Sequence, residues 1–469
     1  MPQIFFDEFD GVADGMEDAD VEYHDDLVKV PIRLITLIDL AMSSQLDFGD
    51  LGGLTAFLQT GYTEAILDYY GMGDRRDGED SEYETSPPLL QCSYYAAWGD
   101  RTVDGGLYMT RNMDFTEDTG IYTYAMITAF VPDEGVPYAS ISWLGATLGV
   151  LAGINEEGLA ISAVGSESPY ERLTTEPALF RAREALEFSS DVDDAMPYLL
   201  NNISDGINRA PTIGYNALLS WGDPREGGAD AQSVILESNG LETGVFHHNN
   251  DCTVEPSLVR YDYDGIATVW TPTDHPDEVN FEADAKEIDG EGKVRLFAHD
   301  GQGNLLTNQE GKYYEDPTNG IPIQTGYPED CALYRGDEAM AYGVRIHQKA
   351  SNGPMRGDGR LMVDSGSWRG RYWPMREMTI AYAEGTAFEW EDEEVIPDNS
   401  GQQVLIGLDE AEAISRVAAM DSNVWDVVYD TTNLKVRLSY ESGAGDNWMP
   451  AHEQPPFLEI DLKKLFLTD

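Results

Sequence analysis

The residues of this sequence best suited to covalent chemistry lie in one window, QCSYYAAWGDRTVDGGLYMTRNMDF, which spans residues 91–115. Cys92 can act as a nucleophile, because a thiolate attacks carbonyl carbon readily. Arg111 favours that thiolate if the two side chains meet, and Asp114 can orient the guanidinium or hold an ammonium group. The window therefore predicts Cys92, Arg111 and Asp114 as catalytic residues.

Two strands must bring these side chains together. Aromatic, β-branched and other apolar residues predict the strands Leu90–Arg101 and Gly106–Phe115, and Val103-Asp104-Gly105 between them favours a hairpin turn. This chain reversal returns the Arg-Asn-Met-Asp end of the second strand to the cysteine. Two registers are open. If the ladder centres near Val103, Asp114 lies opposite Cys92, and if it centres after Asp104, residue 117 does. We favour the first, because both candidate residues of the second strand then lie within reach of the sulfur.

A cysteine nucleophile also needs a general base. The sequence has seven histidines, none in a recognisable motif: His24, His247, His248, His275, His299, His347 and His452. If the Gln91–Cys92 bond is cut, the new α-amino group of Cys92, with a reference pKa of about 8, can accept the thiol proton within the same residue. A conventional cysteine hydrolase that uses a remote histidine is the alternative.

The window resembles a known family, the N-terminal-nucleophile hydrolases of the peptidase C45 or acyl-CoA:6-aminopenicillanate acyltransferase type, with bile-salt hydrolases and acid-ceramidase-like amidases as more distant relatives. The shared pattern is a Cys-Ser/Thr start, an Ala-Ala-Trp-Gly-like strand, Thr-x-Asp-Gly, and Arg-Asn-x-Asp before an aromatic residue. In this chain the pattern occupies Cys92-Ser93, Ala96-Ala97-Trp98-Gly99, Thr102-Val103-Asp104-Gly105 and Arg111-Asn112-Met113-Asp114-Phe115. The turn at residues 153–159 and the strand at residues 427–430 extend the similarity weakly.

The resemblance implies an α+β fold, an αββα four-layer sandwich with mainly antiparallel sheets. It implies self-cleavage between Gln91 and Cys92, then attack of Cys92 on the amide or thioester carbonyl of a small acyl substrate, without a cofactor. Water or an acceptor amine would resolve the acyl-enzyme, and Arg111 and Asp114 would position the amino group and the thiolate. A catalytically silent relative with a binding or structural role is the alternative.

The oxyanion donor is the point where this chain departs from the pattern. Relatives present a later asparagine, and the nearest counterpart places Asp337 at that position. A charged carboxylate cannot donate to a developing oxyanion. Asn216 is the second candidate for this role.

The charge of the chain excludes some partners. With 86 acidic and 29 basic residues, the net charge is −57, and such a field repels nucleic acid and anionic membranes. Acidic residues spread along the chain favour a protein adapted to high salt, and an acidic protein from an ordinary cell is the alternative.

No apolar run approaches the roughly 18 residues of a membrane span, and no leader is visible, so we expect a cytoplasmic protein. An exported protein that has lost its leader is the alternative. The sequence does not predict an oligomeric state.

The organisation of the chain follows from its composition. We expect an N-terminal segment, residues 1–91, with a helix at Asp26–Leu46 and an acidic linker at Asp74–Pro88, before a catalytic domain at 92–469 in which about 251–375 stays unassigned. The three cysteines, Cys92, Cys252 and Cys331, predict neither a disulfide framework nor a metal site.

Within the second part, period-2 patterns predict strands and 3.6-period patterns predict helices. The predicted strands are Tyr122–Val131, Ala139–Leu144, Leu148–Ile154, Gly158–Val164, Tyr215–Trp221, Ser233–Glu237, Thr379–Ala383, Trp425–Asp430 and Lys435–Glu441. The predicted helices are Glu176–Phe188, Val192–Ile203 with Asp191 as N-cap, and Asp409–Met420.

Overall fold

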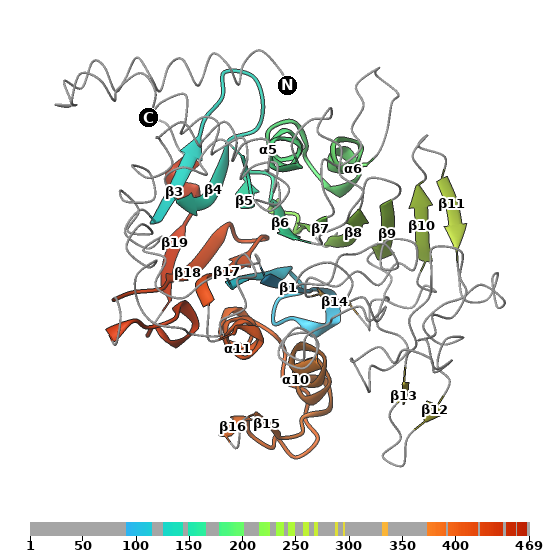
Figure 1. The fold of residues 1–469 in the computed structure, drawn as a ribbon, viewed down its shortest axis with the longest axis vertical. Coiled ribbons are helices and arrows are strands. Elements are labelled where there is room, and N and C mark those ends of the chain that lie inside the picture. Colours follow the sequence, from blue (N-terminus) through green and yellow to red (C-terminus); the bar gives the residue numbers. More distant parts are fainter. Residues whose placement is uncertain are drawn as a thin grey trace, which may run out of the picture.

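A computed structural model of the chain gives the fold (Figure 1). It describes residues 91–114, 125–143, 149–165, 178–200, 215–225, 231–238, 243–248, 257–261, 267–270, 287–288, 294–295, 331–335, 373–390, 393–420, 423–443, 447–455 and 457–466. The predicted helix and linker of the first 90 residues lie outside these ranges.

One sheet carries the cysteine window. Its strands, in spatial order β14-β1-β2-β17-β18-β19, are β14 (Ala332–Arg335), β1 (Gln91–Ala97), β2 (Tyr108–Asp114), β17 (Asn423–Asp430), β18 (Lys435–Tyr440) and β19 (Leu458–Asp461). Both strands of the window, β1 and β2, are therefore interior strands of the sheet. Every residue of β2 and β17 is buried. Strands covered on both faces carry few exposed polar side chains, so a polar residue in them needs an internal partner.

A second sheet packs on the first. Its order is β11-β10-β9-β8-β7-β6-β5-β4-β3, made by β3 (Ala125–Phe130), β4 (Tyr138–Trp143), β5 (Ala152–Asn155), β6 (Leu159–Gly165), β7 (Tyr215–Trp221), β8 (Gln232–Ser238), β9 (Thr243–His248), β10 (Ser257–Tyr261) and β11 (Ala267–Trp270). Every strand pair of the two sheets in the described part is antiparallel.

Helices cover the outer face of each sheet. The helices α5 (Ala178–Phe188) and α6 (Val192–Leu199) pack on β5 to β8, whereas α10 (Trp373–Glu384) and α11 (Leu408–Ala418) pack on β14, β1, β2 and β17. Figure 1 shows the resulting order of helix, sheet, sheet and helix, with β1 facing β6 across the middle. The predicted mixed α+β fold with mainly antiparallel sheets is confirmed, and its four layers are those of an αββα sandwich.

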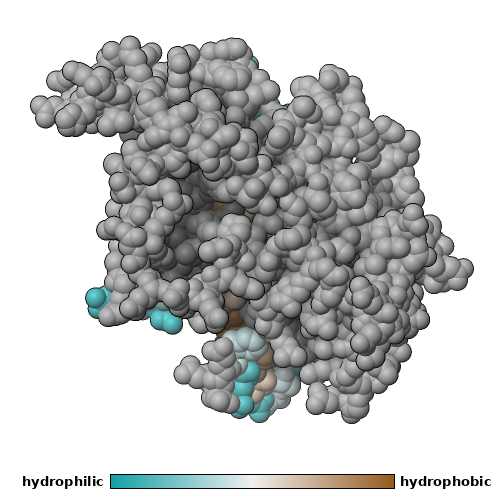
Figure 2. Space-filling view, viewed as in Figure 1, coloured by the Kyte–Doolittle hydropathy of each residue, from teal (hydrophilic) through white to brown (hydrophobic). Residues whose placement is uncertain are grey.

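Smaller elements complete the description. They are η2 (Gly99–Arg101), β12 (Glu287–Ile288), β13 (Val294–Arg295), β15 (Phe388–Trp390), β16 (Glu393–Ile396), η6 (Ala451–Glu453) and α12 (Lys463–Phe466). In space-filling form, the described surface over α10, β15 and β16 mixes hydrophilic and hydrophobic side chains (Figure 2). Among the helices of the described residues, none has the length and apolarity that a bilayer crossing requires.

Most predicted elements of the second part are present with shifted ends. Asp191 caps α6 as predicted, accepting a hydrogen bond from the Asp194 backbone nitrogen at 2.9 Å, but the helix ends at Leu199 rather than Ile203. Gly158 closes the turn before β6 with a left-handed backbone, at φ +81°. The unassigned region about 251–375 contains strands β10 to β14.

Two predictions are wrong. The predicted strand Thr379–Ala383 lies inside helix α10. There the Thr379 hydroxyl donates a hydrogen bond to the Met375 carbonyl at 2.6 Å, so this buried polar group finds its partner within the helix. The cysteine spacing predicted no disulfide framework, but Cys331, which is buried in the core, is disulfide-bonded.

Candidate functional site

Cys92 is the second residue of the interior strand β1. Its side chain is 1% exposed, and it forms no disulfide. Cys92 lies opposite Met113, and Tyr94 lies opposite Arg111. Residues two apart on a strand, and residues directly opposite, share a face of the sheet. Cys92 and Arg111 therefore share the face that looks toward the second sheet, and the Arg111 Nη2 donates to the Cys92 sulfur over 3.3 Å.

Asp114 takes a different place from the predicted one. The structure pairs it with Gln91, one residue away from the favoured register. Because a slip of one residue exchanges the faces of a strand, Asp114 belongs to the face of the sheet that α11 covers, opposite to the sulfur. Its backbone position nevertheless lies across from the residue that precedes the Gln91–Cys92 bond.

The Arg111 guanidinium is fully buried without a carboxylate partner in the described part of the chain. Its Nη2 also donates to the Ala163 carbonyl on β6 at 3.0 Å, and its carbon lies 4.5 Å from the centre of the Trp425 ring. Its Nε and Nη1 have no hydrogen-bond partner among the described residues. A buried cation of this kind is costly unless an anion compensates it. A Cys92 thiolate is such an anion. The Nε and Nη1 of Arg111 can also donate hydrogen bonds to an oxygen of a bound molecule.

Tyr429 stands on the same side of β17, two residues from Val427, which lies opposite Arg111. Burial raises the pKa of its hydroxyl well above the usual value, although the Arg111 charge opposes this shift. The hydroxyl therefore stays protonated at neutral pH, and it has no partner among the described residues. It adds a neutral donor to this side of the sheet, beside the charged Arg111.

The Asp114 carboxylate is held from the α11 side. Its Oδ1 accepts hydrogen bonds from the Met420 backbone nitrogen at 3.1 Å and from the Asn423 side chain at 3.1 Å. The same Asn423 nitrogen donates to Asp426 Oδ1 at 3.0 Å. Burial first, and then the charge of Asp114, raise the pKa of the Asp426 carboxyl well above its usual range. A second acid thus lies beside the predicted one.

Of the oxyanion candidates, Asn216 is fully buried on β7. It lies opposite Val164 of β6, the neighbour of the Ala163 carbonyl that Arg111 contacts. Leu218, two residues further along the same strand, belongs to the core between the sheets, so Asn216 faces that space too. Asp337 lies outside the described residues, and of Gln91 the structure describes only the strand position.

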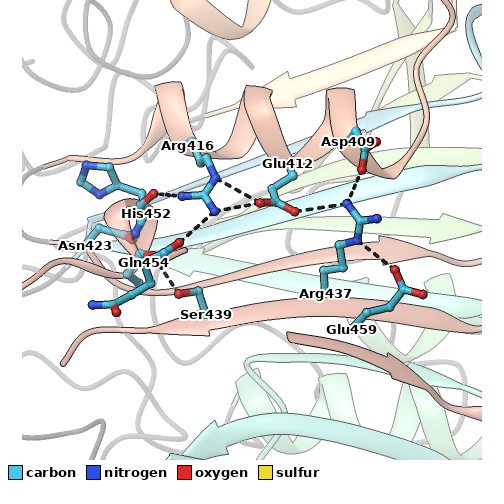
Figure 3. Close-up of polar contacts among 10 residues, drawn as sticks. Asp409, Glu412, Arg416, Asn423, Arg437, Ser439, His452, Gln454 and Glu459 are labelled. Carbon is cyan, nitrogen blue, oxygen red and sulfur yellow. Dashed lines mark hydrogen bonds and ion pairs between the residues drawn. The ribbon is translucent and has the colours of Figure 1, made fainter. Parts of the chain in front are cut away.

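Asn423, Asp426 and the ion pairs next to them were not predicted from the sequence. A usable signal was present, because an aspartate in the middle of the apolar strand sequence NVWDVVYD must have internal partners. Figure 3 shows the adjoining ion pairs, in which Arg437 of β18 contacts Asp409 of α11 at 2.6 Å, and Arg416 contacts Glu412 within α11 at 2.8 Å.

These ion pairs also fix the turn η6. Arg416 donates to the carbonyl of His452 and, at 2.9 Å, to that of Gln454. The backbone nitrogen of His452 in turn donates to the Asn423 side-chain oxygen at 2.9 Å. Asn423 is thereby oriented with its nitrogen toward the two acids. In the described residues no cluster of side chains has the composition of a metal site.

Comparison with known proteins adds the following. No family model matches the chain, and no curated protein matches its sequence. Among solved structures, a mutant of the conjugated bile acid hydrolase from Clostridium perfringens is 10% identical over 80% of this chain and 95% of that chain, at a TM-score of 0.30. Penicillin V acylase from Agrobacterium tumefaciens is 12% identical over 79% and 92%, at 0.27.

A third neighbour, the Caenorhabditis elegans ortholog of N-acylethanolamine-hydrolyzing acid amidase, is 14% identical over 38% of this chain and 69% of that chain, at a TM-score of 0.27. These neighbours are N-terminal-nucleophile hydrolases, the class that the Cys92 window resembles. Because the TM-scores are low, the function proposed below rests on the residues around Cys92.

Proposed function

We propose that this chain is an autoproteolytic N-terminal-nucleophile hydrolase or acyltransferase, which cuts itself before Cys92 and then acts on an amide or thioester bond of a small acyl substrate. The observation that carries the proposal is the 3.3 Å contact between the Cys92 sulfur and the fully buried Arg111 guanidinium, which has no carboxylate partner among the described residues. The domain division follows, with residues 1–91 as the segment removed from the N-terminus of the catalytic part, 92–469.

Self-cleavage begins when the Cys92 sulfur attacks the Gln91 carbonyl carbon. The thiol proton goes to the departing Cys92 nitrogen, the C–N bond breaks, and residue 91 becomes a thioester on the sulfur. Water then hydrolyses this thioester, releasing a carboxylic acid at residue 91 and the free thiol. Asp114 supports this step because it lies opposite Gln91, where its carboxylate can hold the new ammonium group.

In the processed enzyme the α-amino group of Cys92 takes the proton of its own thiol. The thiolate, favoured by Arg111, attacks the substrate carbonyl, and the ammonium group returns the proton to the leaving amine or thiol. Water or an acceptor amine then attacks the thioester and regenerates the thiol. The Arg111 Nε and Nη1, which have no partner among the described residues, can donate to the developing oxyanion, and the Asn216 amide is the other candidate donor.

Intact mass under denaturing conditions tests the first step. The wild-type chain should appear as two polypeptides, the second beginning at Cys92, whereas Cys92→Ala should stay a single chain. A wild type that remains whole and whose thiol does not react would support the silent-relative alternative instead. Loss of activity on mutation of a histidine, in an enzyme insensitive to blocking of the α-amine, would favour the conventional cysteine hydrolase.

A further inference from the structure

Strand β17 begins with an irregularity in its ladder. Its pairing with β2 shifts by one residue between Asn423 and Trp425, so Val424 is the extra residue of a β-bulge. On a regular strand, Asn423 and Asp426 would point to opposite faces, because they are three positions apart. The Asn423 Nδ2 nevertheless donates to Asp426 Oδ1 at 3.0 Å. The bulge has therefore turned Asn423 to the face of the sheet that α11 covers.

On that face, Asn423 holds the last residue of β2. Its Nδ2 donates to Asp114 Oδ1 at 3.1 Å and to the Met113 carbonyl at 3.2 Å, and the side chains of Asn423 and Asp114 are fully buried. Asp114 lies directly opposite Gln91, whose carbonyl carbon is bonded to the Cys92 nitrogen. Bulges often occur beside active sites, where they re-aim a side chain. This bulge aims an amide at the acid that lies across from the bond broken in self-cleavage.

The orientation of the Asn423 amide is fixed by its oxygen. The Oδ1 accepts a hydrogen bond from the backbone nitrogen of His452 at 2.9 Å, and a backbone N–H can only donate. The amide nitrogen must therefore face the two carboxyl groups, because a reversed amide would lose hydrogen bonds on both sides. His452 belongs to η6, and Arg416 of α11 donates to the carbonyls of His452 and of Gln454, which ends this turn (Figure 3). Arg416 thus holds the turn that orients Asn423.

We propose that Asn423 is a positioning residue for self-cleavage, which holds the Asp114 side chain across from the Gln91–Cys92 bond. Arg416 keeps Asn423 in this place through η6. The inference rests on the proposed function, because in that mechanism Asp114 receives the new ammonium group. Asn423 lies on the face of the sheet opposite to the sulfur, so it acts through Asp114 and not on the thiol.

Replacement of Asn423 by alanine in the full chain is the first test. The variant loses a hydrogen bond to a carboxyl group, so self-cleavage followed by intact mass should slow about 10-fold or more. Asn155→Ala is the matched control. Asn155 is also fully buried, its oxygen accepts from the Leu159 backbone nitrogen at 3.0 Å, and its nitrogen donates to the carbonyls of Leu186 and Ser189 at 2.9 and 2.8 Å. Both variants should lose melting temperature, but Asn155→Ala should cut at the wild-type rate.

A double-mutant cycle separates positioning from a loss of stability. In an Asp114→Asn background, Asn423→Ala should slow cleavage by less than about twofold, because the group through which Asn423 acts is already gone. The loss of melting temperature caused by Asn423→Ala should remain. A residue that only stabilises the fold would slow cleavage by the same factor in both backgrounds, and that result would overturn the inference.

A pair of arginine variants tests the link through η6. Arg416→Met frees the turn and should slow cleavage about 3-fold or more, because the orientation of Asn423 is no longer fixed. Arg437→Met is the matched control and should cut at the wild-type rate, since Arg437 also pairs with Glu412 but binds no carbonyl of η6 among the described residues.

The outcomes are distinct. Equal cleavage rates of Asn423→Ala and Asn155→Ala, or of Arg416→Met and Arg437→Met, would contradict the inference. If Asn423→Ala does not fold, or if Asp114→Asn cuts too slowly to measure, the arginine pair decides. A wild type that stays whole contradicts the proposed function, whereas a wild type that cuts no faster than Asn423→Ala contradicts only the positioning role.

Discussion

Replacing Arg111 by methionine should separate the reactivity of the site from its stability. The substitution removes the charge-assisted contact to the Cys92 sulfur at 3.3 Å. Hydrogen bonds to charged groups contribute about 1.5–3 kcal/mol, so the self-cleavage rate at neutral pH should fall roughly 10- to 150-fold. It also removes a fully buried cation, two nitrogens of which have no partner in the described part of the chain, and apolar replacement of such groups is often neutral or stabilising. The melting temperature should therefore hold or rise.

Arg183→Met is the matched control, because Arg183 is also buried and also lies over an aromatic ring, that of Phe130 at 5.1 Å. Arg183 pairs with Glu187 at 3.3 Å, so its replacement breaks a buried ion pair, which should cost about 3–5 kcal/mol. Cleavage, followed by intact mass, should stay at the wild-type rate. An Arg111→Met chain that cuts as fast as wild type, or that loses as much thermal stability as Arg183→Met, would refute the reasoning.

Three further predictions concern stability. Gly158→Ala should lower the free energy of unfolding in urea by more than Gly105→Ala, because both sites have positive φ but only at Gly158 would a Cβ lie 2.3 Å from the Gly222 carbonyl oxygen; equal losses would contradict this. Transfer from molar salt to dilute buffer should lower the melting temperature, because a net charge of −57 is then screened far less, and an unchanged value would argue against salt adaptation. The melting temperature of Asp426→Asn, relative to that of wild type, should rise between about pH 4 and pH 7. The reason is that the raised pKa of Asp426 makes the native wild type keep a proton that its unfolded chain releases above about pH 4. A difference in melting temperature that stays constant with pH would contradict the shift.

Local pattern was enough to predict much of the fold. The aromatic, β-branched and other apolar residues after Cys92 predicted β1 and β2, and Asp191 marked the start of α6. The strand predicted at Thr379–Ala383 failed because its β-branched residues outweighed a longer signal. Buried Met375, Met378 and Tyr382 recur at helical spacing, and a longer window would have shown this.

The site was harder to predict because it depends on register and on distant contacts. The ladder of β1 and β2 ends at the pair Ala97 and Tyr108, and the 3-10 turn η2 occupies part of the connection, so the hairpin does not centre on a tight turn at Val103. The resulting shift of one residue puts Asp114 on the other face from the thiol. The partners of Asp114 come from residues more than 300 positions later, and hairpin geometry contains no information about them.

The most direct test of the central claim is to locate the acyl group on the working enzyme. The purified protein is mixed with an activated acyl ester, quenched in acid, and mapped by peptide mass. We predict a hydroxylamine-labile acyl group on a peptide that begins at Cys92, and no such adduct on Cys92→Ala. An acyl group on another residue, or on a peptide that still contains the Gln91–Cys92 bond, would contradict it.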